Sequence, residues 1–71
     1  MTHEDFVKEV KRIAGPRSWS ATSENYADAE RAIVNIGGVV EVRSTRPAAI
    51  DAARGISDHL ATRDRVAGGV K

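Results

Sequence analysis

Two adjacent glycines, Gly37 and Gly38, constrain the fold of this chain more than any other sequence feature. They separate two runs rich in β-branched residues, which read AIVNI before the glycines and VVEVR after them. A two-residue hairpin turn needs residues that adopt positive φ, which glycine does at no steric cost. The sequence therefore predicts an antiparallel hairpin whose register places Val34 opposite Glu41.

A helix is predicted before this hairpin. Thr2 is suited to be its N-cap, with Asp5 three residues later, and Gly15 followed by Pro16 is a stop signal. The apolar residues between these ends fall on one helical face: Phe6, Val7, Val10, Ile13 and Ala14.

A second helix is predicted after the hairpin, with Thr45 as its N-cap and Pro47 in its first turn. Its apolar stripe consists of Ala49, Ala52, Ala53, Ile56 and Leu60. From Arg63 onward the helical period is lost. We therefore expect one compact domain over residues 1–62 and a frayed or disordered tail over residues 63–71.

The segment between the first helix and the glycines has two interpretations. In one, residues 25–36 form a helix that ends at Gly37, which gives the order α-β-α-β-α and only two short strands. In the other, the RSWSAT and AIVNI stretches are both strands, and Trp19 shares a face with Ala21. A two-stranded sheet is marginally stable in water, so we favour the second interpretation. It predicts a small single α+β domain of order α-β-β-β-α, with a three-stranded antiparallel meander and both helices on one face.

That order, from Glu4 to Leu60, resembles the topology of double-stranded RNA-binding domains. In that family the last helix opens with a lysine cluster that straddles the phosphates. The corresponding stretch here, STRPAAIDAAR, contains Arg46 near its start and no lysine. The resemblance lies in element order alone, and a domain of this shape without the lysine cluster is better suited to bind protein. We assign no family from it.

The predicted register divides the hairpin into two faces. One face is expected to meet the helices, and with them it gives a predicted core of Phe6, Val10, Ile13, Trp19, Ile33, Val40, Val42, Ala53, Ile56 and Leu60. The other face is predicted to be a protein-binding surface of three apolar residues and two opposite charges, namely Val34, Ile36, Val39, Glu41 and Arg43. We expect either a target protein or a second copy to cover it, and a homodimer would let Glu41 meet Arg43 of the other chain.

No catalytic constellation is present in the sequence. The chain has no cysteine, and its two histidines, His3 and His59, have no partner at a recognised metal-ligand spacing. Neither glycine pair precedes the Lys-Ser/Thr that a phosphate-binding loop requires. We therefore expect a protein that is not an enzyme and that needs no metal or cofactor.

Positive and negative charges nearly balance, with eleven Lys and Arg against ten Asp and Glu, and the two signs are mixed along the chain. Arg43, Arg46 and Arg54 are the candidate contacts for nucleic acid or for an acidic partner, but carboxylates are interleaved with them. Nucleic acid is therefore the less favoured partner, because phosphate binding usually needs a basic excess. The sequence has no apolar run that suits a signal peptide or a membrane span, so we expect a cytoplasmic protein without membrane contact.

Together these features predict a small binding module that regulates or inhibits a larger macromolecule through a protein–protein surface. Accessory proteins of phages and other mobile elements, including inhibitors of host defence complexes, are often of this size. The alternative is a small nucleic-acid-binding regulator that uses the arginines around the last helix. No motif identifies the partner.

Overall fold

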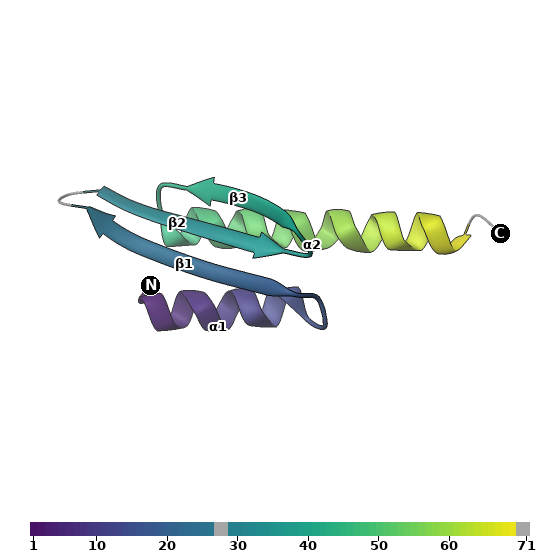
Figure 1. The fold of residues 1–71 in the computed structure, drawn as a ribbon, viewed down its shortest axis with the longest axis horizontal. Coiled ribbons are helices and arrows are strands. Elements are labelled where there is room, and N and C mark those ends of the chain that lie inside the picture. Colours follow the sequence, from purple (N-terminus) through teal and green to yellow (C-terminus); the bar gives the residue numbers. More distant parts are fainter. Residues whose placement is uncertain (27–28, 70–71) are drawn as a thin grey trace.

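The computed structural model describes residues 1–26 and 29–69. One helix precedes and one helix follows a three-stranded antiparallel sheet in which β2 is the central strand. The order α-β-β-β-α is as predicted, and the alternative helix over residues 25–36 does not form (Figure 1). The elements are α1 (His3–Ala14), β1 (Trp19–Tyr26), β2 (Ala29–Ile36), β3 (Val39–Arg43) and α2 (Arg46–Gly69).

Both helices begin at the predicted caps. The backbone N–H of Asp5 donates to Thr2 Oγ1 at 3.1 Å, and Gly15 ends α1 with a φ of 61°. At the start of α2, the backbone N–H of Ala48 donates to Thr45 Oγ1 at 3.2 Å. Each hydroxyl oxygen satisfies an N–H that has no partner within its own helix.

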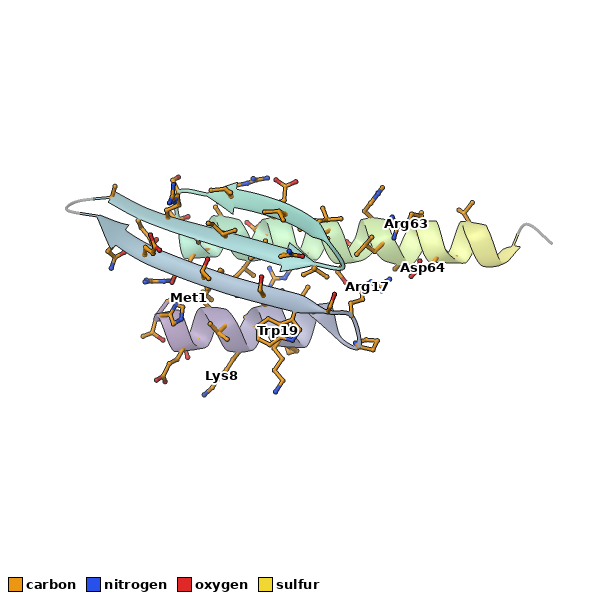
Figure 2. The ribbon with its side chains drawn as sticks, in the orientation of Figure 1. Met1, Lys8, Arg17, Trp19, Arg63 and Asp64 are labelled. Carbon is orange, nitrogen blue, oxygen red and sulfur yellow. The ribbon has the colours of Figure 1, made fainter. Side chains whose placement is uncertain are left out.

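The end of α2 lies further along the chain than the sequence predicts. The helix continues to Gly69 and projects past the end of the sheet, whereas the sequence predicts a tail from residue 63 (Figure 1). Leu60 is a core residue of α2, and residues 61–66 after it are exposed. Beyond it, Arg17 NH2 lies 2.7 Å from Asp64 Oδ2 and links the helix to the segment before β1 (Figure 2). The remainder of the predicted tail, residues 70–71, lies outside the described residues.

The glycine pair forms the predicted two-residue turn. Gly37 and Gly38 have φ values of 59° and 89°, as a type I′ turn requires. Asn35 Oδ1 accepts a hydrogen bond from the backbone N–H of Gly38 at 3.1 Å and stabilises the turn. The register follows as predicted, with Val34 opposite Glu41.

Both helices pack on the same face of the sheet, α1 against β1 and α2 beneath β2 and β3, and they also contact each other (Figure 1). The core between these layers consists of Phe6, Val10, Ala14, Ala32, Val34, Ile36, Ala49, Ile50, Ala53, Ile56 and Leu60. Five of the predicted core residues are confirmed in this cluster: Phe6, Val10, Ala53, Ile56 and Leu60.

The predicted assignment of the hairpin faces is wrong. Val34 and Ile36 are fully buried against the helices, whereas Val40 and Val42 are 53% and 48% exposed. The pairing of β1 with β2 explains this reversal, because it places Trp19 opposite Ile36. Directly paired residues share a face of the sheet, so the two side chains point to the helices together.

Candidate protein-binding surfaces

The sheet face away from the helices, here called the outer face, is covered by no element of the described chain (Figure 1). Because side chains alternate along each strand, it carries the residues that do not point to the core. Most of them are polar. The outer face comprises Ser20, Thr22 and Glu24 of β1, Arg31, Ile33 and Asn35 of β2, and Val40 and Val42 of β3.

Three apolar residues form a strip along β2 and β3 on this face. Val42 lies directly opposite the partly buried Ile33, and Val40 is the next outer-face residue along β3. Val40 and Val42 are each about half exposed. We call Ile33, Val40 and Val42 the apolar strip.

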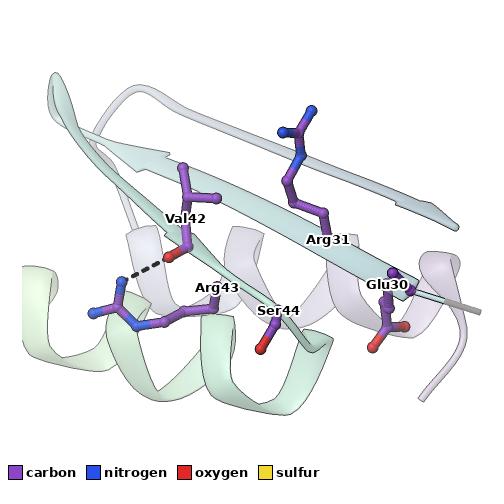
Figure 3. Close-up of a pocket in the computed structure, with 6 residues that line it drawn as sticks. Glu30, Arg31, Val42, Arg43 and Ser44 are labelled. Carbon is purple, nitrogen blue, oxygen red and sulfur yellow. Dashed lines mark hydrogen bonds between the residues drawn. The ribbon is translucent and has the colours of Figure 1, made fainter. Parts of the chain in front are cut away.

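A hollow of about 350 Å³ adjoins one end of this strip, where β3 leads into α2. Ala29, Glu30, Arg31, Val42, Arg43 and Ser44 line it (Figure 3). Arg43 NH1 donates to the backbone oxygen of Val42 at 2.8 Å within this hollow (Figure 3). The Arg43 side chain therefore lies along the free edge of β3.

A second hollow of about 280 Å³ runs between β3 and α2 on the other side of that edge. We call it the β3–α2 groove. It is lined by Val39, Glu41, Arg43, Ala52, Gly55, Ile56 and His59. Arg43 NH1 and Glu41 Oε2 are 2.9 Å apart, so opposite charges face each other at its rim.

The structure separates the residues that the sequence groups into one protein-binding surface. Val34 and Ile36 belong to the core, so the prediction that they lie on an exposed face is wrong. The other three, Val39, Glu41 and Arg43, lie together in the β3–α2 groove. Sequence reasoning missed the exposed valines of the apolar strip because it placed them inside.

Arg46, a predicted contact for nucleic acid or an acidic partner, is turned into the molecule. Its side chain is 14% exposed, and its NH1 lies 2.6 Å from Glu30 Oε1. Its backbone N–H donates to the other oxygen of Glu30 at 3.1 Å, and its Nε donates to Ser23 Oγ at 2.9 Å. Arg46 thus ties the start of α2 to β1 and β2.

The other two predicted arginine contacts also face carboxylates. Arg43 pairs with Glu41, while Arg54 lies 3.4 Å from Asp51 and 3.9 Å from Glu9. All three arginines are therefore engaged within the chain, which leaves less of their charge for phosphate.

One histidine and one serine are in hydrogen-bond contact. His3 Nδ1 lies 2.7 Å from Ser23 Oγ, the oxygen that also accepts from Arg46. In a catalytic triad a carboxylate would orient the histidine. Here both oxygens of Glu30 are used by Arg46 instead. The cluster holds the starts of α1 and α2 to β1.

On α1, the carboxylate of Glu9 lies between the guanidinium groups of Arg12 and Arg54. Glu9 accepts a hydrogen bond from Arg12, and this contact holds the pKa of Glu9 below its ordinary value, with a smaller contribution from Arg54. The same bond raises the pKa of Arg12. Because Arg54 belongs to α2, Glu9 also helps to join the two helices.

No family model, curated protein or solved structure matches this chain. Among the described residues, His and acidic side chains do not gather into a group of three or more that could hold a metal ion. Over the same residues, no helix has both the length and the apolar character needed to cross a membrane.

Proposed function

We propose that this protein is a non-enzymatic binding module that regulates or inhibits a larger macromolecule by covering part of its surface. The contact is made by the apolar strip on the outer face. The observation that carries this proposal is the half exposure of Val40 and Val42, side by side on a sheet face without a covering layer.

The surroundings of the strip support a protein contact. Protein interfaces combine an apolar centre with a polar rim, and here hydroxyl, amide and charged groups of β1 and β2 surround the apolar residues. The strip is also held on a sheet whose opposite side is packed against two helices. A rigid surface loses little conformational entropy on binding, which favours affinity.

A protein partner is favoured over nucleic acid by the distribution of charge. Nucleic-acid affinity comes mainly from phosphate contacts with arginine and lysine. Arg43, Arg46 and Arg54 each face a carboxylate of the same chain. The formal net charge of +1 adds little attraction for a polyanion.

The test is an affinity pull-down with wild-type protein, Val40→Glu and Val66→Glu, followed by titration with the purified partner. Val66, on α2, is 59% exposed and gives a matched control in which the same charge is added away from the sheet. We expect Val40→Glu to weaken binding at least tenfold and Val66→Glu to leave it unchanged. Circular dichroism checks that both variants are folded.

Two results would contradict the proposal. One is a partner that binds wild type and Val40→Glu with equal affinity, because the strip then plays no part. The other is binding that falls steeply with added salt and needs DNA or RNA, which would identify a nucleic-acid-binding protein instead.

A further inference from the structure

The free edge of β3 has backbone groups available for another strand. β3 pairs with β2 on one side only, and it is an edge of the sheet. In a hairpin closed by a two-residue turn, the closing pair is hydrogen-bonded and bonding alternates from there. Ile36 and Val39 are that closing pair, so the N–H and C=O groups of Val40 and Val42 point away from β2. The bond from Arg43 NH1 to the Val42 oxygen agrees with this direction, and the Arg43 side chain must turn away from that oxygen before another strand can pair there.

The helix beside this edge has a glycine that no contact with the described residues explains. Gly55 lies in the interior of α2, where glycine is among the least favourable residues. Gly55 is not among the positive-φ glycines, and a Cβ placed there would meet nothing within 4 Å. Gly55 lines the β3–α2 groove together with Ala52. Small residues at an open groove permit the close approach of another main chain.

From these features we infer that β3 pairs with β3 of a second copy, in antiparallel orientation, to form a two-fold dimer with a continuous six-stranded sheet. This inference does not depend on the proposed function, because it uses the backbone of β3 and the groove rather than the side chains of the outer face.

Charge complementarity favours a second copy as the occupant, and it favours a register centred on Val42 over one centred on Glu41. With Val42 opposite Val42 of the second copy, Glu41 faces Arg43 of the other chain, and the reverse contact occurs by symmetry. A register shifted to centre on Glu41 would place two carboxylates directly opposite, which is unfavourable. Glu41 and Arg43 are 40% and 43% exposed, so both are accessible for this exchange. The strand is thus complementary to itself.

The helices then meet at an ordinary packing distance. Neighbouring strands are spaced at about 4.8 Å, and α2 contacts both β2 and β3. If α2 lies beneath the midpoint of these strands, two paired copies bring their α2 helices to about 10 Å, which is the usual separation of packed helices. Ala52, Gly55 and His59 occupy the side of α2 that lines the groove and would face the second helix.

Charge exchange gives the first test, measured as mass by sedimentation equilibrium. We expect wild type to be a dimer, and both Glu41→Arg and Arg43→Glu to be monomers, because each places like charges opposite each other. The double variant Glu41→Arg/Arg43→Glu restores opposite charges in the same register and should be a dimer again. An equimolar mixture of the two single variants should form a heterodimer, because all four charges are then complementary.

The second test places a longer side chain on α2. Gly55→Gln introduces a good helix former, so each chain should remain folded. The longer side chain should prevent the two α2 helices from meeting, and the measured mass should be that of a monomer. Ala61→Gln is the matched control, because Ala61 is exposed on α2 and lies off the groove. We expect its mass to equal that of wild type. Circular dichroism and thermal melting confirm folding for every variant.

A wild type that sediments as a monomer at about 100 μM would overturn the inference. A dimer that survives Gly55→Gln, or that survives both single charge reversals, would show that the copies associate through another surface. The same variants can be titrated with a target found for the apolar strip. A variant that is monomeric but still binds this target would show that dimer formation and target binding use different surfaces.

Discussion

At the scale of single residues, the two turn glycines differ in what surrounds them. Both have positive φ, but a Cβ on Gly37 would lie 2.9 Å from Leu60 Cδ1, whereas a Cβ on Gly38 would meet nothing within 4 Å. Gly37 therefore serves the turn and the contact between the sheet and α2, while Gly38 serves the turn alone.

This difference predicts unequal effects of alanine at the two positions. Gly38→Ala should lower the free energy of unfolding by about 1 kcal/mol, which is the cost of a left-handed conformation for a residue with a Cβ. Gly37→Ala should cost more, because the core residue Leu60 must also move. Urea denaturation of both variants measures the difference. Equal losses would mean that the side chain of Leu60 adjusts freely.

The Glu9–Arg12 contact predicts a dependence of stability on pH. The pKa of Glu9 is lowered by folding, so the ionised carboxylate favours the folded state. This contribution is present above the ordinary pKa of 4.5 and is lost as the pH falls through the lower value in the folded protein. Glu9→Gln should therefore be less stable than wild type at pH 7, and the difference should shrink as the pH falls below 4.5.

Thermal melts across this pH range test the prediction. Repeating the substitution in an Arg12→Gln chain provides the control, since the effect of Glu9→Gln should be smaller once its main partner is removed. A stability gap that persists in acid would show that Glu9 acts through packing rather than through charge.

At the scale of elements, the two faces of β2 predict different losses of stability when its two isoleucines are truncated. Ile36 is fully buried against the helices, whereas Ile33 is partly buried on the outer face. Ile36→Ala should destabilise the protein by about 2–5 kcal/mol, the usual cost of such a core truncation. Ile33→Ala should cost clearly less. Chemical denaturation compares them directly, and a larger loss at Ile33 would contradict the assignment of the two faces.

The same strand shows how far sequence predicts this fold. The glycine pair determines the turn and the register between β2 and β3, because few residues adopt positive φ. Register does not say which face is covered, since β2 has apolar residues on both faces, with Ile33 on one and Val34 and Ile36 on the other. The missing information was the pairing of β1 with β2, in which Trp19 lies opposite Ile36. No glycine pair stands between β1 and β2 to indicate that pairing, and residues 27–28 lie outside the described residues.

Local preference also misleads in the middle of the chain. The stretch YADAER favours helix, yet Tyr26 ends β1 and Ala29 begins β2. Strand pairing over eight positions and the burial of Ala32, Val34 and Ile36 outweigh a propensity of a few tenths of a kcal/mol per residue. The helix caps have no such competition, and they were predicted correctly.

At the scale of the whole molecule, the candidate site depends on the same face assignment. Glu41 and Arg43 were predicted to be accessible, and they are. Charged side chains at an edge strand remain in solvent whichever face of the sheet the helices cover. Val40 and Val42 could be recognised as exposed only once the helix-bearing face was known.

The projecting end of α2 predicts that the core survives truncation. Residues 61–66 are exposed, and the contact of Arg17 with Asp64 is a surface ion pair worth about 0–1 kcal/mol. A chain that ends at Thr62 should therefore unfold cooperatively with a melting temperature within a few degrees of wild type. Loss of a cooperative transition in calorimetry would show that the distal helix contributes to the core.

The length of α2 also determines how the protein moves through solvent. The molecule measures 52 × 17 × 15 Å, and its radius of gyration is 13.3 Å. A compact domain of this chain length would have a radius of gyration of about 11 Å. The rod-like shape increases hydrodynamic friction, so a single chain will elute from a sizing column ahead of globular standards of equal mass. Elution volume alone would then overestimate the mass of a single chain.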